Sequence, residues 1–168
     1  VSQSAPETLD ILCDVGLLEN SGQDRYTLHQ TIADYAAIHL TEILPGERFV
    51  AYCISFIENH IADYEALALE IHNLLAGLKC AFENHMYTLL VRGVHLFTPF
   101  LLARGLYDLA FLHLQRALQI VIWSHNTPVL TTMYLNLGEV KYQQGDYSEA
   151  EIEFRQGLKL ARDYDYRE

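Results

Sequence analysis

The sequence is poor in the residue types that would tie it to disulfides or to membranes. Its three cysteines, Cys13, Cys53 and Cys80, are far apart and odd in number, and no two have the CxxC spacing of a zinc or redox site. Each stands in an apolar stretch, so we expect buried free thiols and a reducing, cytoplasmic environment. No run approaches about eighteen uncharged apolar residues, so no membrane span is expected.

Basic residues are scarce as well. Lysine and arginine number 11 against 22 acidic residues, which gives a net charge of -11. Nucleic acids and anionic membranes attract basic surfaces, so we expect neither as the main partner. Hydrophobic residues nevertheless make up 51% of the 168 residues, which is enough to bury a core.

Motifs of the common enzyme classes are missing. The sequence contains no GxxxxGK[ST] phosphate loop, no GxSxG nucleophile elbow and no HExxH metal motif. The eight histidines are scattered, and we interpret them as structural. We therefore expect no catalytic residue, no metal site and no cofactor bound by this chain alone. An enzyme of unrecognised type is kept as an alternative.

What the sequence does contain is an internal repeat with a spacing of forty residues. Gly105-Leu-Tyr-Asp-Leu-Ala110 leads into Leu114, and Gly145-Asp-Tyr-Ser-Glu-Ala150 leads into Phe154. A repeat at fixed spacing is typical of stacked helix pairs in which each pair buries its apolar face against the next. A generic all-α bundle is the alternative.

The second copy fits the tetratricopeptide pattern W-x2-L-G-x2-Y followed by A-x3-F. Leu137 and Gly138 match its first part, and Ala150 and Phe154 match its second. We expect the two small residues where the helices cross closely, with Leu137 and Phe154 filling the space beside them. Gly145 then supplies the backbone freedom for the turn.

The first copy is weaker. Thr98 stands in place of the small glycine, and Pro99 follows it, so we expect a kinked or delayed helix there. The spacing of forty residues exceeds the usual repeat of about 34, which predicts longer helices or a longer link. Asn126-Thr-Pro128 is the expected link, with Asn126 or Thr127 as the helix cap.

The residues before the repeats predict further helices and a small hairpin. Helices are expected over 48–62 and 65–83, and from 29 to 44 with an end at Pro45-Gly46. A helix between Pro6 and Gly16 precedes two short strands, 17–19 and 25–28. Helix, hairpin and helix follow one another in this order in the C-terminal part of a winged helix.

These expectations define the fold class and the domains. The chain is predicted to be mainly α, a partial winged helix with a small β-hairpin followed by an array of tetratricopeptide-like helix pairs. The segments are a winged helix over 1–45, a helical linker pair over 46–90 and two repeats over 91–168. The winged segment holds seven acidic residues and a single basic one, Arg25, which disfavours DNA binding.

Several stretches of this N-terminal half resemble a known family. Leu9-x2-Leu12-x2-Val15-Gly-Leu-Leu18, then Arg25-Tyr-Thr-Leu-His29, then Ile32-Ala-Asp-Tyr-Ala36 resembles the winged helix that follows the NB-ARC nucleotide-binding core of STAND signalling ATPases. Leu69-Glu-Ile-His-Asn73-Leu-Leu-Ala-Gly-Leu78 is similar to the linker helix that joins such cores to tetratricopeptide repeats in bacterial members.

The resemblance implies a switch in the intact parent protein. The upstream core would bind ADP in a closed state and ATP in an open one, and the winged helix would close on that core. His29 matches the family's histidine that touches the β-phosphate, although Gln30 stands where the plant pattern has an aspartate. The repeats would act as a sensor or docking arm in signal transduction.

The sequence thus leads to one main hypothesis and, besides the unrecognised enzyme, two alternatives. The first is a non-catalytic regulatory and protein-interaction fragment of a STAND-type protein. A free-standing tetratricopeptide adaptor and, less favoured, a winged-helix DNA-binding regulator are the alternatives. Both ends look cut, so we expect an excised piece whose array continues past Glu168.

The repeat geometry predicts where a partner binds. The concave face should come from the first helix of each pair and should take a protein or peptide. The residues expected there are Arg92 and His95 in the first copy and Glu139, Tyr142 and Gln143 in the second. The apolar end of a truncated array would also favour self-association between chains.

Overall fold

The computed structural model describes residues 6–22, 25–39, 43–123 and 126–165. Helices dominate this part of the chain, so the predicted mainly α fold with one small antiparallel hairpin is confirmed. In chain order the elements are α1 (Pro6–Asp14), β1 (Leu18–Gly22), β2 (Arg25–Leu28), α2 (Gln30–His39), α3 (Ile43–Asn59), α4 (Tyr64–Leu69), α5 (Ile71–Glu83), α6 (Tyr87–Ala103), α7 (Tyr107–Val121), α8 (Thr127–Gln144) and α9 (Tyr147–Asp165).

The chain divides into two compact units, Val1–Pro45 and Gly46–Glu168. The first unit holds α1, the hairpin and α2. Strands β1 and β2 pair antiparallel with Leu18 opposite Leu28, and the register shifts between Asn20 and Gly22. The expected hairpin is confirmed, although its first strand begins one residue later than predicted and runs on to Gly22.

One helix boundary in this region was predicted wrongly. The expected helix over 29–44 is present only as α2, which ends at His39, and residues 40–42 lie outside the described part. Pro45 and Gly46 do not stop a helix, because they lie in the first turn of α3. Proline is tolerated in a first turn, where the backbone N–H groups have no intrahelical partner to lose.

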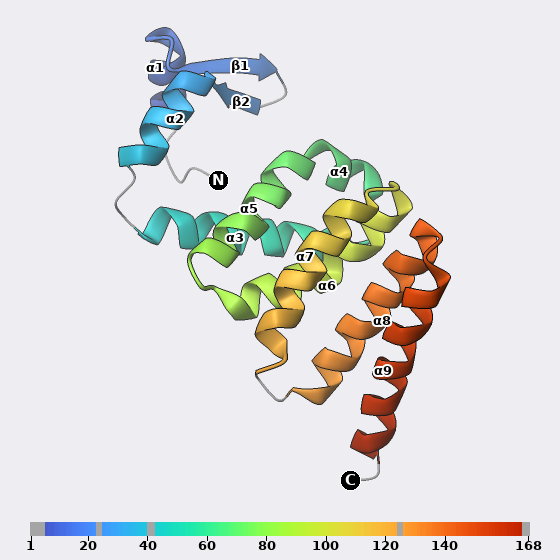
Figure 1. The fold of residues 1–168 in the computed structure, drawn as a ribbon. Coiled ribbons are helices and arrows are strands. Elements are labelled where there is room, and N and C mark those ends of the chain that lie inside the picture. The colour runs from blue at the N-terminus through green and yellow to red at the C-terminus, as the bar shows by residue number, and fades with distance from the viewer. Residues whose placement is uncertain (1–5, 23–24, 40–42, 124–125, 166–168) are drawn as a thin grey trace. The chain divides into compact units, whose positions relative to one another are not determined.

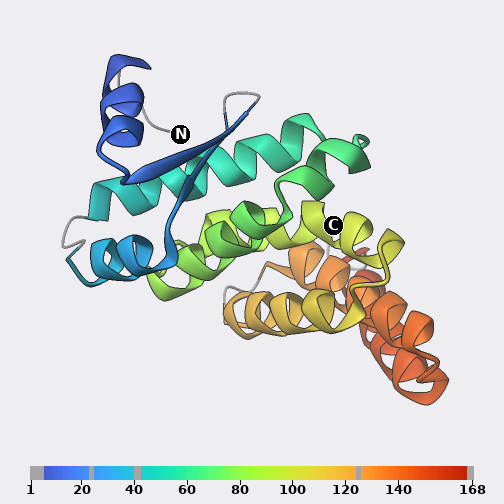
Figure 2. The same ribbon diagram turned by 90° about the horizontal axis from the view of Figure 1, so that it is seen from above.

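The helices of the second unit pack in chain order. Helix α6 contacts α7, α7 contacts α8, and α8 contacts α9 over most of its length. Figures 1 and 2 show these four helices side by side, each running back along the one before it. Helix α6 also touches α8, as expected when the first helices of successive pairs line one face of an array.

A continuous apolar core runs through this second unit from α3 to α8. Phe97 and Phe100 of α6 stack at 5.1 Å between ring centroids near its centre. Burying a side chain of this size contributes about 1.5–3 kcal/mol, so these positions dominate the stability of the array. The largest fully buried side chains are Phe97, Phe100, Ile57, Leu67, Leu74, Leu78, Leu90, Leu101, Leu114, Met133, Val50 and Val94.

The predicted helix over 65–83 is broken at Glu70. Helix α4 is capped by Asp63, whose Oδ1 accepts a hydrogen bond from the Ala66 N–H at 3.0 Å, and α5 starts again at Ile71. The change of direction buries both Leu67 and Leu74 in the core. Between residues 46 and 90 the chain thus forms most of α3, all of α4 and α5, and the start of α6 at Tyr87.

Three turns between helices share one geometry. His85, Gly105 and Gly145 all have positive φ, of 58°, 71° and 86°. In each turn the next residue's N–H donates to a carbonyl five residues back, as Met86 does to Ala81 at 2.8 Å. A tyrosine follows each time, and His85 precedes Gly105 by half the spacing of the repeat. The turn after α5 therefore has the same geometry as those after α6 and α8, although its φ is held by a histidine instead of a glycine.

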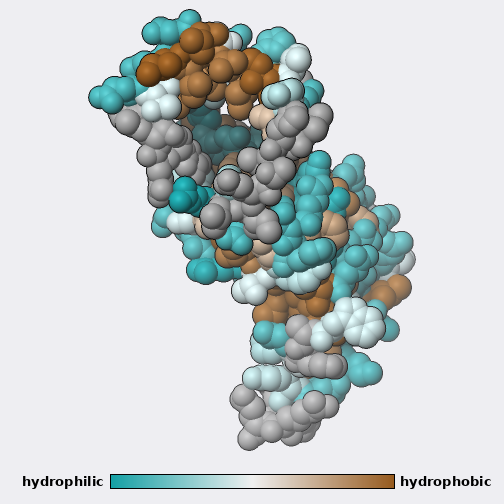
Figure 3. Space-filling view, turned by 90° about the vertical axis from the view of Figure 1, so that its left-hand side faces the viewer, coloured by the Kyte–Doolittle hydropathy of each residue, from teal (hydrophilic) through white to brown (hydrophobic). Residues whose placement is uncertain are grey.

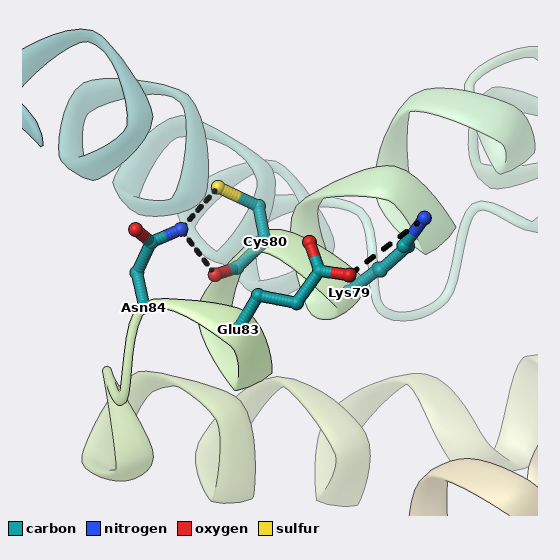
Figure 4. Close-up of polar contacts among 4 residues, drawn as sticks. All are labelled: Lys79, Cys80, Glu83 and Asn84. Carbon is teal, nitrogen blue, oxygen red and sulfur yellow. Dashed lines mark hydrogen bonds and ion pairs between the residues drawn. The ribbon is translucent and has the colours of Figure 1, made fainter. Parts of the chain in front are cut away.

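The end of α5 shows how a non-glycine residue is held in this turn (Figure 4). The side-chain amide of Asn84 donates to the Cys80 carbonyl at 2.9 Å and lies 3.4 Å from its sulfur. Lys79 pairs with Glu83 at 3.7 Å on the outer face. The Cys80 carbonyl also accepts the Asn84 backbone N–H at 3.0 Å, so the side chain adds a second hydrogen bond to this carbonyl at the end of the helix.

The predicted close crossing of α8 and α9 is confirmed. A β-carbon added to Gly138 would lie 2.6 Å from the Phe154 ring, so only glycine leaves room for that ring. Lys141 joins the same two helices, with its Nζ 2.6 Å from Glu149 and 4.4 Å from the centre of the Phe111 ring on α7. Asn126 caps α8 as expected by accepting the Val129 N–H at 3.3 Å.

Pro99 does not delay the helix that contains it. Helix α6 begins at Tyr87, twelve residues earlier, and runs through Pro99 to Ala103. Pro99 is exposed, so its ring needs no room in the core. The buried Thr98 hydroxyl donates back to the Val94 carbonyl at 2.7 Å, so this polar group has a hydrogen-bond partner within the apolar core.

Candidate partner-binding groove

A groove of about 900 Å³ opens on the second unit where three helices meet. Its walls are the first half of α6, the last turn of α7 with Trp123 beyond it, and the first half of α8. Because the side chains come from segments about forty residues apart, the stacking of the helices creates the groove. The residues that line it are Tyr87, Thr88, Val91, Arg92, His95, Gln119, Ile120, Val121, Trp123, Asn126, Pro128, Val129, Thr132 and Met133.

The lining is mainly apolar. Val121 and Met133 are almost fully buried, and Val91, Ile120 and Val129 are half-buried around them. Trp123 is 82% exposed and is the single tryptophan of the chain. An aromatic side chain of this size that stays in water is a common anchor of protein interfaces.

Among the residues that line the groove, Arg92 carries a formal charge. Its Nε pairs with Glu58 of α3, and the arginine side chain is 61% exposed. His95, one turn further along α6, lies with its Nδ1 3.5 Å from the side-chain nitrogen of Asn136 on α8. This contact links the first helices of the two pairs beside the groove.

The structure brings together part of the predicted site. Arg92 and His95 line the groove, whereas Glu139, Tyr142 and Gln143 lie further along α8 and do not. The Gln143 amide donates to Glu139 at 2.7 Å, and the Tyr142 ring meets that of Tyr147 at 5.4 Å. Asn136 precedes Glu139 by three residues, so both lie on one side of α8.

The sequence did not predict that α7, the second helix of the first pair, contributes to the groove. The prediction assigned the binding face to first helices alone, so Ile120, Val121 and Trp123 were not predicted. The available signal was Ile122-Trp123 directly before the link at Asn126, since large apolar residues at a helix end need a cover. The pairing of that end with Val91 and Val129 depends on packing across the array and has no local signature.

His29, the predicted phosphate contact, lies immediately before α2. Its side chain is exposed, and its Nδ1 accepts a hydrogen bond from the Thr31 N–H at 3.4 Å. That bond leaves the proton on Nε2, which can donate to an anion. An exposed imidazole donor at a helix N-terminus fits a phosphate, although it also fits a simple helix cap.

In the described part of the chain, no group of three histidine, cysteine, aspartate or glutamate side chains is placed to hold a metal ion. No described helix is long and apolar enough to cross a membrane. Cys53 is buried, which raises the pKa of its thiol to about 12, and its Sγ donates to the Asn73 carbonyl at 3.4 Å.

Comparison with protein families finds one match. The tetratricopeptide repeat family matches residues 100–163, which extend from the end of α6 into α9. No curated protein matches the chain, and no solved structure does. Residues 100–163 are thus similar to tetratricopeptide repeats, and this similarity supports a protein-interaction role for the array.

Proposed function

We propose that the array docks a segment of a partner protein in the groove between α6, α7 and α8. The observation that carries this proposal is the large apolar groove, with the exposed Trp123 at its edge, on helices similar to tetratricopeptide repeats. A pocket of this volume buries most of a short peptide or a drug-sized molecule. The helices that line it are fixed by the core, so the groove is formed before a partner arrives.

Site-specific cross-linking tests the docking proposal. A benzophenone amino acid at Thr88, inside the groove, should cross-link discrete partner proteins in the source cells. The same group at Gln115, exposed on α7 outside the groove, is the matched control. Identical cross-linked bands from both positions, or none from Thr88, would contradict docking in the groove.

Two substitutions define how far the docked segment extends. Arg92→Ala should weaken capture of the cross-linked partner about tenfold or more, because Arg92 lines the groove. Tyr142→Ala should weaken it only if the segment continues along α8 beyond Asn136. Circular dichroism should show both variants folded, since both side chains are largely exposed.

A finer proposal is that the chain is the regulatory arm of a STAND-type nucleotide switch. Besides the resemblance, the first unit leaves large apolar side chains in water, and Figure 3 shows brown surface on this unit at the top of the view. An upstream nucleotide-binding core would cover such a surface. The exposed side chains are Ile11, Val15, Leu17, Leu28 and Tyr35.

His29 would then contact the nucleotide in the intact parent. The core, not this chain, would bind ADP or ATP, because the sequence has no phosphate loop. In a protein that joins the two, His29→Ala should speed the release of ADP. A gene that encodes no phosphate loop upstream of Val1 would rule out the switch and leave a free-standing adaptor, which explains the groove equally well.

A further inference from the structure

We propose that the groove selects partner segments in which apolar side chains flank an acidic residue, and that Arg92 binds the acidic side chain. This inference rests on the docking function proposed above and adds the chemistry of the segment. The occupant is a stretch of a partner protein, since the apolar lining extends over three helices and offers room for several side chains.

The lining sets the apolar part of the preference. Val91, Ile120 and Val129 line the groove together with the buried Met133, and methionine adapts its shape to different apolar side chains. Trp123 stands at the edge, where a bound segment would cover its ring. Covering apolar surface contributes about 25 cal/mol per Å², so this lining supplies most of the affinity.

Arg92 sets the acidic part. Its Nε side is occupied by Glu58, which comes from α3 and holds the guanidinium in place beside the groove. The terminal amino groups remain to bind a second carboxylate, because a guanidinium presents five N–H donors in a planar fork. The lining itself contains no acidic residue, and Glu58 is the carboxylate beside it, in contact with the Nε side of Arg92. The bound carboxylate would therefore lie on the other side of the guanidinium, away from Glu58.

His95 adds a neutral donor beside the arginine. If the Asn136 side chain donates to Nδ1 across their 3.5 Å contact, the imidazole proton sits on Nε2. A neutral imidazole in this form donates one hydrogen bond to an anion. His95 lies three residues after Arg92, so both side chains emerge from the same face of α6.

The net charge of the chain, by contrast, favours basic ligands. A charge of -11 attracts basic ligands over long distances. At physiological ionic strength this attraction is screened beyond about 8 Å, whereas a carboxylate on Arg92 is in contact and partly shielded from water. The local contact therefore decides which segment stays bound, and acidic segments should win over basic ones.

Pools of capped pentapeptides test this directly on the full chain. All pools carry mixed Leu, Ile, Phe and Val at positions one, two, four and five. Position three is Asp or Glu in one pool, Asn or Gln in the second and Lys or Arg in the third. Because Trp123 is the single tryptophan, its fluorescence reports binding at the groove. We expect the acidic pool to bind at least tenfold more tightly than the amide pool.

A matched pair of variants assigns the preference to Arg92. Arg92→Gln should abolish the difference between the acidic and amide pools while both still bind. Arg155→Gln, which removes an exposed arginine of α9 outside the groove, should leave the tenfold difference intact. A preference that survives Arg92→Gln would overturn the assignment.

The possible failures separate the two proposals. Equal binding of the acidic, amide and basic pools would overturn acidic selection and leave docking in the groove standing. No binding of any pool would count against both. A Trp123 emission that shifts with protein concentration, before any peptide is added, would show that a second copy of the chain fills the groove and would overturn both.

Discussion

At the scale of single residues, His113 is a buried polar side chain whose burial costs stability. It is 4% exposed on α7, and its Nδ1 has no hydrogen-bond partner in the described structure. Burial, and to a lesser degree the positive charge of Arg116, lowers its pKa from 6.5 to about 4. The folded protein therefore keeps this imidazole neutral at pH values where the unfolded chain protonates it.

Stability should consequently fall in mild acid. The unfolded chain binds the proton near pH 6.5 and the folded one only near pH 4, so the His113 contribution is complete above pH 6.5 and is lost between these values. The loss should reach about 3 kcal/mol. Urea unfolding of wild type and His113→Leu at pH 7.5, 5.5 and 4.5 measures it as the difference between the two profiles.

The outcome depends on the difference between variants because carboxylates also titrate in this range. His72→Gln, an exposed histidine of α5, is the matched control and should follow the wild-type profile. Parallel profiles for wild type and His113→Leu would show that His113 does not cause the acid sensitivity.

Replacing His85 by glycine should make the protein more stable. The φ of 58° at His85 strains the backbone of a residue that has a β-carbon by about 1 kcal/mol or more, whereas glycine adopts this conformation without steric strain. His85→Gly should therefore raise the free energy of unfolding by about 1 kcal/mol. Thermal unfolding of the variant, compared with wild type, gives the measurement.

The contact of His85 with Tyr87 could offset this gain. The imidazole Nδ1 lies 2.8 Å from the Tyr87 hydroxyl. His85→Ala removes this contact and retains the β-carbon, so it should be no more stable than wild type. If alanine and glycine stabilise equally, the backbone conformation is not the reason.

At the scale of elements, the α8–α9 pair depends on the space over Gly138. Gly138→Ala should destabilise the chain by about 1–2 kcal/mol, because the displaced Phe154 ring outweighs the better helix propensity of alanine. Chemical denaturation should show the shift. Gly157→Ala is the control, since its β-carbon would meet the Leu135 side chain at 3.3 Å and the Thr131 carbonyl oxygen at 3.5 Å, which is far less crowded than Gly138.

A second substitution tests the cause of that effect. Phe154→Leu in the Gly138→Ala background should recover part of the lost stability, because the smaller side chain no longer meets the new methyl group. Strictly additive effects of the two changes would show that the clash is not what destabilises Gly138→Ala.

At the scale of the whole molecule, the two units differ in how much they bury. In the first unit, no side chain described between residues 7 and 36 is fully buried, whereas every buried side chain of the described residues lies in the second unit. The free energy that protects a backbone amide from exchange grows with such burial. The first unit should therefore open at a lower free energy than the second.

Hydrogen exchange should reveal this difference. Amides of α1 and α2 should exchange at least a hundredfold faster than those in the middle of α6, measured by mass spectrometry at pH 7. Amides near the exposed end of α9 serve as an internal reference for fraying. Comparable protection in α2 and α6 would mean that the first unit is as stable as the array.

Much of the fold could be predicted because its determinants are local. Helical periodicity predicted the mainly α class, and the glycines at 105 and 145 marked two turns. The small and large residues at 138 and 154 located a helix crossing. Asn126 followed by Pro128 marked the start of α8. Each of these signals lies within a few residues of the feature that it determines, so a single sequence carries it.

The tertiary structure decided the rest. The break at Glu70 is invisible to periodicity, because the residues on both sides of it continue the same apolar pattern. The turn at His85 lacks the glycine that marks the other two. The groove depends on Val91, Ile120 and Val129, which are remote in sequence and meet only when the helices stack. A single sequence therefore determined the helices and their order, and packing between distant segments alone created the surface on which a partner can bind.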